Sequence, residues 1–191
     1  MALIDGVLLA PGAGSRADHS SLLTLEAAII KARPDMAVRR FDFPYRLAGR
    51  RFPDRAPVLM EEVRDQLARF HDETGASSIV VGGRSMGGRI CSMVAAEHHP
   101  YIAGVLAICY PLHPPRKPDR LRVEHFPALL VPTCFISGDR DEFGSPEELD
   151  TWIPTITGPV TRHLLAGKRH DLRGCDNDVA ALSTEWITGR F

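Results

Sequence analysis

The seven residues GGRSMGG, at positions 82–88, decide the fold of this chain. They follow the apolar run IVV at 79–81 and precede a segment whose apolar residues have helical spacing. The stretch contains the pattern G-x-S-x-G, which between a strand and a helix places a serine on a strained turn with its hydroxyl exposed. Gly83 and Gly87, on either side of Ser85, let the chain pass without side-chain collision. We therefore interpret Ser85 as a candidate nucleophile rather than as an incidental serine in a glycine-rich turn.

A serine hydroxyl is a weak nucleophile without a base, so the pattern predicts an acid and then a histidine at later strand ends. Asp139 and Asp141 follow the strand-like run at 133–137. Of the eight histidines, only His170 follows the last strand-like run after a glycine-containing turn. We expect His170 to be the base and Asp141 to orient its imidazole, with Asp139 as the alternative acid.

The loop APGAGS, at residues 10–15, follows the first strand-like run. In this arrangement the second backbone donor of an oxyanion hole comes from that loop. We expect the N–H groups of Ala13 and Met86 to bind the oxyanion, and each such donor is worth roughly 3–4 kcal/mol. Gly12 and Gly14 carry no side chain that would keep a substrate away, so both are candidate substrate contacts.

A long irregular stretch between residues 110 and 131 contains five prolines. Loops of this length in compact domains are often functional. This stretch and Tyr45 would either line an acyl pocket or only pack over the sheet. The side chains that we expect to contact substrate are Tyr45, Arg84, Tyr110 and His113.

Six short apolar runs alternate with amphipathic segments along the chain. The runs lie at residues 4–10, 37–43, 78–82, 103–109, 133–137 and 159–165. Runs without polar alternation are typical of strands buried on both faces, and their alternation with helices predicts right-handed crossovers in a parallel sheet. We expect residues 1–191 to form a single three-layer α/β/α domain with a mostly parallel sheet of about six strands.

The composition argues against several other classes of protein. With 23 basic and 24 acidic residues, the formal net charge of −1 does not suggest a nucleic-acid binder. The longest apolar stretch, at residues 102–110, is far short of the roughly 20 residues that span a bilayer. No basic segment precedes the apolar residues at 1–6, so we expect no signal peptide. The four cysteines form no CxxC pair, and we expect a cytoplasmic protein without a metal site.

The segment GAGSRA, at residues 12–17, offers a competing interpretation. It matches the dinucleotide-binding pattern G-x-G-x-x-[GA], and Asp42 ends the next strand-like run. However, the helical stripe begins only at Leu22, and Asp42 lies 28 residues past Gly14, beyond the expected spacing of about 20. A nucleotide-binding oxidoreductase would also leave the serine, the acid and the histidine unexplained, so we rank it below a hydrolase.

The order Ser85, Asp141, His170 at strand ends resembles that of the α/β-hydrolase fold, and more narrowly its compact dienelactone-hydrolase-like branch. That branch includes small bacterial proteins and eukaryotic testis-expressed and chromatin-complex relatives. The resemblance covers essentially the whole chain and includes FDFPY at 41–45, YPLHPP at 110–115 and DEFGSPEEL at 141–149.

The chain also departs from the family pattern. The two leading strands of the full fold are missing, Pro11 stands where many hydrolases carry a histidine, and Ser85 stands where dienelactone hydrolase has a cysteine. The resemblance implies a minimal, lidless serine hydrolase that needs no cofactor. It would act on an ester or related acyl bond of a small soluble substrate through an acyl-enzyme. A catalytically silent interaction module that keeps the turn as architecture is the alternative, and the sequence does not determine the oligomeric state.

Overall fold

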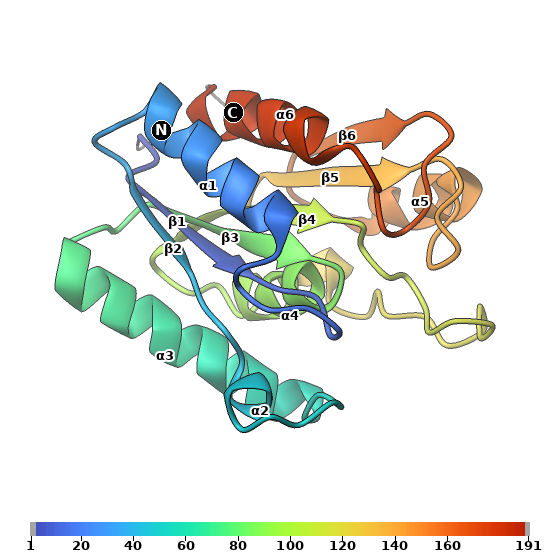
Figure 1. The fold of residues 1–191 in the computed structure, drawn as a ribbon. Coiled ribbons are helices and arrows are strands. Elements are labelled where there is room, and N and C mark those ends of the chain that lie inside the picture. Colours follow the sequence, from blue (N-terminus) through green and yellow to red (C-terminus); the bar gives the residue numbers. More distant parts are fainter. Residues whose placement is uncertain (1–2, 190–191) are drawn as a thin grey trace.

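Six parallel strands form the central sheet of the computed structural model, which describes residues 3–189 (Figure 1). The strands are β1 (Gly6–Ala10), β2 (Ala37–Arg40), β3 (Ile79–Arg84), β4 (Ile102–Ile108), β5 (Thr133–Gly138) and β6 (Val160–Leu165). Their order across the sheet is β2-β1-β3-β4-β5-β6, and every neighbouring pair is parallel. The predicted parallel sheet of about six strands is therefore confirmed. Residues 1, 2, 190 and 191, which belong to the predicted 1–191 domain, lie outside the described range. Two of them, residues 1 and 2, also belong to the N-terminal segment 1–6, from which we expect no signal peptide.

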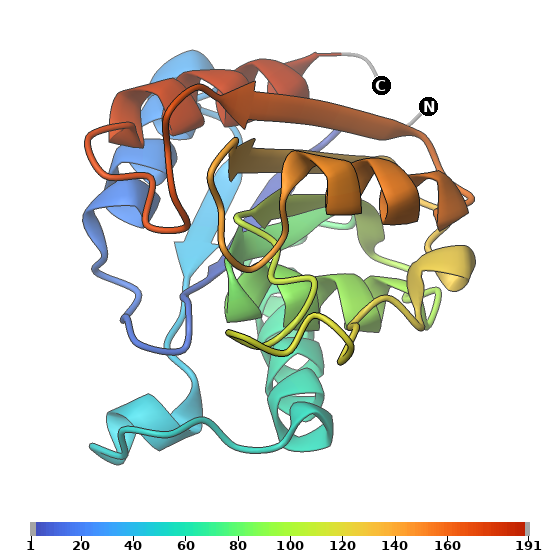
Figure 2. The same cartoon turned by 90° about the vertical axis from the view of Figure 1, so that its right-hand side faces the viewer.

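Helices cover both faces of the sheet (Figures 1 and 2). Helices α1 (Ser20–Ala32) and α6 (Asp176–Thr188) pack on one face, and α3 (Ala56–Thr74) and α4 (Met86–Ala95) pack on the other. The short helix α5 (Pro146–Trp152) lies on the same side as α3 and α4, where its Leu149 joins their apolar cluster. The result is the three-layer arrangement that the alternating sequence pattern predicts.

Local sequence signals account for several helix ends. Helix α1 stops at Ala32, two residues before Pro34, because a proline disfavours helical backbone at the preceding residue. Helix α3 ends at Thr74, and its C-cap is Gly75, whose φ of 73° is left-handed backbone that glycine adopts without strain. Helix α5 begins with a capping box, in which Ser145 and Glu148 each bond the other's backbone N–H.

Two apolar clusters, one on each face, bury the central strands. Leu25 and Ile29 of α1 meet Val179 of α6 on the first face, whereas Leu67 of α3 and Ile90 of α4 lie in the cluster on the second. Strands β1, β3 and β5 are buried along their whole length, and the edge strands β2 and β6 are only partly covered. Each fully buried aliphatic side chain contributes roughly 1.5–3 kcal/mol, so the two clusters hold the strand ends firmly in place.

The strand order places a crevice at the carboxyl ends of β1 and β3. From β1 the chain moves to β2 at one edge, and from β3 it moves stepwise toward β6 at the other edge. The loops that follow β1 and β3 therefore run in opposite directions along the sheet, and they separate. The crevice between two such loops is the usual ligand site of an open parallel sheet. The irregular segment predicted at 110–131 borders the same end and contains only the short 3-10 helix η1 (Phe126–Ala128). Within residues 3–189, no helix is both long enough and apolar enough to cross a membrane.

Candidate active site

The turn between β3 and α4 holds Ser85 in a conformation that few L-residues adopt, with φ 47° and ψ −114°. Its surroundings enforce this backbone. A Cβ added to Gly83 would lie 1.9 Å from the carbonyl oxygen of Ala10, and one added to Gly87 would lie 2.4 Å from the same oxygen. Strand β1 therefore runs so close to the turn that only glycine fits on either side of Ser85, and the Ser85 amide donates to the Ile108 carbonyl at 2.7 Å.

The structure brings Ser85, His170 and Asp141 into one hydrogen-bonded chain. The Ser85 Oγ lies 2.9 Å from His170 Nε2, and His170 Nδ1 lies 2.9 Å from each carboxylate oxygen of Asp141. A carboxylate only accepts hydrogen bonds, so Nδ1 carries the hydrogen and Nε2 is free to accept the serine proton. This is the arrangement by which a serine hydroxyl is activated.

Asp141, and not Asp139, meets the histidine. The side chain of Asp141 is 1% exposed, and its Oδ1 also accepts from the Phe143 amide at 2.9 Å. Asp139 Oδ1 is buried without a hydrogen-bond partner among the described residues, and its amide donates to the Leu165 carbonyl. The difference arises because the chain turns back toward His170 only after Asp139.

Arg84 does not occupy the predicted substrate-contacting position. It is buried, and its guanidinium donates to the carbonyls of His170 and Asp171 at 3.4 and 3.0 Å and to Ser21 Oγ at 3.2 Å. Arg84 therefore ties the loop that carries the histidine to the end of β3. The Phe143 ring packs on the imidazole of His170, with ring centroids 4.1 Å apart.

Two tyrosines expected to contact substrate instead hold loops in place. Tyr45 is fully buried, and its hydroxyl donates to the Ala13 carbonyl at 2.9 Å. Tyr110 is also buried, and its hydroxyl donates to the Arg122 carbonyl at 2.7 Å. His113 borders a separate cavity, where its Nε2 lies 3.2 Å from a carboxylate oxygen of Glu148.

A cavity of about 280 Å³ opens beside Ser85, and its walls include Ala13 and Met86. Met86 is the first residue of α4, where backbone N–H groups have no acceptor within the helix and favour negative charge. Gly12 lies against the serine, since a Cβ added there would be 3.6 Å from the Ser85 Cβ. Gly14 is exposed, with no atom within 4 Å of an added Cβ, and does not line this cavity.

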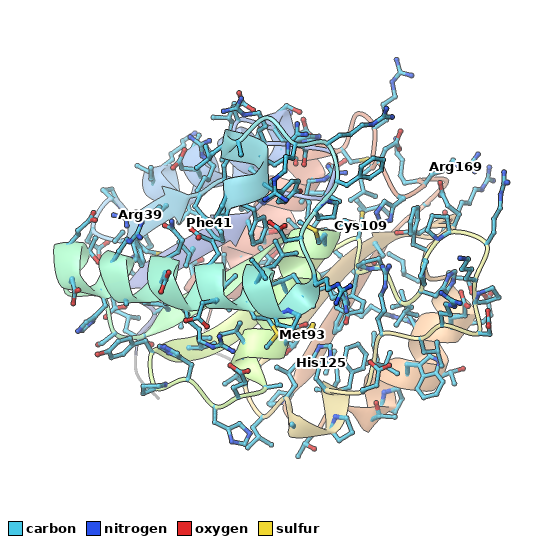
Figure 3. The ribbon with its side chains drawn as sticks, turned by 90° about the horizontal axis from the view of Figure 1, so that it is seen from below. Arg39, Phe41, Met93, Cys109, His125 and Arg169 are labelled. Carbon is cyan, nitrogen blue, oxygen red and sulfur yellow. The ribbon has the colours of Figure 1, made fainter. Side chains whose placement is uncertain are left out.

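A larger cavity, of about 640 Å³, lies on the other side of Asp141 and includes His113, Arg116 and Arg169 but not Ser85 (Figure 3 labels Arg169). One trio of potential metal-ligating groups lies near it, since the donor atoms of Cys109, Asp141 and His170 are within 4.8 Å of one another. Burial raises the pKa of the Cys109 thiol, which disfavours the thiolate that binds metals. The other two groups are already bonded to each other, so this trio fits a hydrogen-bonded network better than a cation.

The loop after β1 does not form a dinucleotide site. Helix α1 begins only at Ser20, so the glycines at 12 and 14 do not precede a helix N-terminus directly. Asp42, the candidate ribose ligand, accepts a hydrogen bond from the Ala17 amide at 2.7 Å and lies 3.5 Å from the Arg16 guanidinium. The Asp42 carboxylate therefore binds the loop that follows β1 and holds it in place.

Two residues beside Ser85 were not among the sequence candidates. Arg89 and Arg122 both line the smaller cavity. Arg89 follows Ser85 by four residues, a spacing that puts two side chains on one face of a helix, so helical periodicity alone could have found it. Arg122 lies within the irregular segment, where no periodic pattern predicts its orientation.

A family model described as an alpha/beta hydrolase domain matches residues 4–186. The fold is similar to that of Est1E from Butyrivibrio proteoclasticus, with a TM-score of 0.77 and 10% identity over 97% of this chain and 87% of that one. It is also similar to an α/β serine hydrolase homologue from Coxiella burnetii, with a TM-score of 0.72 and 18% identity over 96% of this chain and 83% of that one.

A third similar structure is a lidless α/β serine hydrolase from Xanthomonas campestris, with a TM-score of 0.72 and 15% identity over 97% of this chain and 82% of that one. At these identities the structures show a shared fold. The narrower dienelactone-hydrolase-like branch stays a prediction.

Proposed function

Because this chain belongs to the α/β-hydrolase family, we propose that it hydrolyses an ester or related acyl bond of a small substrate, with Ser85 as nucleophile. The observation that carries the proposal is the hydrogen-bonded chain from Ser85 Oγ through His170 to Asp141, with 2.9 Å at each step. The serine end of this chain borders the cavity of about 280 Å³.

In the proposed reaction, His170 Nε2 takes the Ser85 proton as Oγ attacks the acyl carbon. The N–H groups of Met86 and Ala13 stabilise the negative charge that develops on the carbonyl oxygen. Collapse of this intermediate breaks the bond to the leaving group, which takes the proton from His170 and leaves an acyl-enzyme. Water then attacks the acyl-enzyme with His170 again as base, while Asp141 stabilises the imidazolium. Collapse of this second intermediate breaks the bond between Ser85 Oγ and the acyl carbon, releases the carboxylic acid and returns the proton from His170 to Ser85.

The cavity volume supports a small acyl or alcohol group. Ligand pockets commonly measure roughly 300–1,000 Å³, and the cavity beside Ser85 lies just below that range. Among the similar structures, Est1E has also been solved with ferulic acid bound. A compact aryl or short-chain ester is therefore the first substrate to test.

The experiment combines a fluorophosphonate probe with 4-nitrophenyl acetate and butyrate. We expect the probe to label the wild-type protein and not Ser85→Ala, and ester turnover to fall by about 10⁴-fold or more in that variant. Asp141→Asn should lower kcat by about 10³- to 10⁴-fold, because the imidazole then loses its correct tautomer. Asp139→Asn is the matched control and should keep turnover close to that of the wild type.

Two outcomes would contradict the proposal. A folded wild-type protein that neither reacts with the probe nor hydrolyses any ester would instead support an interaction module. Equal losses in Asp139→Asn and Asp141→Asn would reject the assignment of Asp141 as the orienting acid.

A further inference from the structure

Two arginines meet at the cavity that contains Ser85. Arg89 lies one helical turn beyond the serine on α4, and its amide donates to the Ser85 carbonyl at 3.0 Å. Arg122 reaches the same cavity from the segment between β4 and β5, where the Tyr110 hydroxyl holds its backbone carbonyl at 2.7 Å. Segments distant in the sequence thus deliver two positive charges to the place where a substrate would bind.

The described residues supply no counter-charge for this pair. Within residues 3–189, no carboxylate oxygen lies within 4.0 Å of either guanidinium, and neither guanidinium donates a hydrogen bond. The cavity has one acidic wall residue among those described, Asp54, and both of its carboxylate oxygens accept from Arg50, at 2.6 and 2.8 Å. The Nε atom of Arg89 is buried without any partner in the described chain.

Holding two like charges partly buried and close together is unfavourable. Burial first, and then the nearby charge of Arg89, lower the pKa of Arg122 from its usual value. A buried charge without a partner costs several times more than an exposed one. By contrast, Arg84, five residues before Arg89, has a hydrogen-bond acceptor for each of its terminal nitrogens. Among the described residues, Arg89 and Arg122 have no such acceptors for their guanidinium groups, and an anionic ligand would supply them.

We propose that the substrate of this hydrolase carries a carboxylate, which Arg89 and Arg122 bind while the ester carbon lies at Ser85. The guanidinium group matches the planar carboxylate with two parallel hydrogen bonds. A carboxylate is smaller than a phosphate, which suits a cavity of about 280 Å³ that must also hold the ester. This inference rests on the proposed function and names the substrate class for the same site.

The test compares two esters that have the same number of carbon atoms, mono(4-nitrophenyl) adipate and 4-nitrophenyl hexanoate. They differ in the terminal carboxylate, so the ratio of their kcat/KM values measures recognition of that group. We expect the wild-type protein to favour the adipate ester by about tenfold or more, as charge-assisted hydrogen bonds imply. In Arg89→Gln and in Arg122→Gln that ratio should fall toward 1. Arg116→Gln, which removes a charge from the larger cavity, is the matched control and should keep the wild-type ratio.

A second measurement records binding without turnover. In the Ser85→Ala protein, monomethyl adipate should raise the melting temperature more than dimethyl adipate does, and Arg89→Gln in that background should abolish the difference. Equal hydrolysis of the two 4-nitrophenyl esters, or an equal change in the Arg116→Gln control, would overturn the carboxylate inference while leaving the hydrolase proposal intact.

If no ester is turned over and the fluorophosphonate probe does not react, the proposed function fails. The binding measurement then decides the inference separately: selective stabilisation by monomethyl adipate supports an anion site at these arginines, and its absence rejects one.

Discussion

The turn after β3 and the long segment after β4 both border the cavity of Ser85, but different forces hold them. Backbone contact defines the turn, because β1 leaves no room for a Cβ on Gly83. Side-chain hydrogen bonds define the segment: Tyr110 donates to the Arg122 carbonyl, and Ser92 Oγ of α4 lies 2.8 Å from His125 Nε2. Figure 3 shows His125 on the side of the sheet that α4 covers.

This difference suggests separate roles for the two regions, one in the reaction and one in the choice of substrate. The turn that presents Ser85, the proposed nucleophile, is sterically locked, so its geometry cannot relax without moving a buried strand. The segment that presents Arg122 is held by single polar contacts, each worth about 1 kcal/mol, and by buried side chains such as Val123 and Phe126. We infer that the reaction chemistry is built on the rigid part and the choice of substrate on the adjustable part.

The largest expected effect is at the turn. Gly83→Ala would force a Cβ to within 1.9 Å of the Ala10 carbonyl oxygen at a residue with φ 145°, so we expect a loss of roughly 4 kcal/mol or more of unfolding free energy. Gly14→Ala is the matched control, because no atom lies within 4 Å of the added Cβ. Urea unfolding of both variants measures the difference. A Gly83→Ala protein as stable as the wild type would show that the turn is not locked.

A smaller effect is expected from pH at the long segment. Burial first, and then the charge of Arg89, lower the pKa of His125 to about 4. In the unfolded chain, where the pKa returns to about 6.5, the ring binds a proton more readily. The neutral ring therefore stabilises the fold above about pH 6.5, and this contribution of up to about 3 kcal/mol is lost as the pH falls toward 4.

Replacing His125 tests this contribution. His125→Gln cannot titrate but can still bond Ser92, so its unfolding free energy should fall less than that of the wild type between pH 7.5 and 5. Urea unfolding at both pH values gives the comparison. Parallel pH dependence in the two proteins would show that His125 is not the titrating group, and the lowered pKa values of His19 and His99 would then be the next to examine.

The smallest effects on stability are expected from Tyr45 and Tyr110, whose hydroxyls hold the Ala13 and Arg122 carbonyls. Tyr110→Phe and Tyr45→Phe should each lower the unfolding free energy by about 1 kcal/mol, because each removes one partly buried hydrogen bond. Their kinetic effects should differ. Releasing Arg122 should lower the preference for the adipate ester, whereas releasing Ala13 should lower kcat for both esters. The same kinetic change in both variants would contradict the proposal that one region serves the reaction and the other serves substrate choice.

Sequence patterns predicted the sheet well and the short elements poorly. The run at 37–43 was expected as one strand, but β2 ends at Arg40, and Phe43 is the N-cap of the helix α2 (Pro44–Leu47), which begins with Pro44. Proline is favoured in the first turn of a helix, so the signal was present but was outweighed by the neighbouring apolar residues. The 3-10 helices η1 and η2 (Ile153–Thr155) are too short for a periodic pattern to reveal.

The sequence by itself determined the turn at Ser85 and the order in which serine, acid and histidine follow parallel strands. These depend on local backbone sterics and on strand order, both of which leave glycine spacing and apolar runs in the chain. Tertiary structure alone decided that Asp141 rather than Asp139 meets His170, that Arg84 holds a loop, and that Arg89 and Arg122 share a cavity. The direction of a side chain near a turn depends on acceptors from distant segments, such as the His170 and Asp171 carbonyls that hold Arg84, and no local pattern encodes those acceptors.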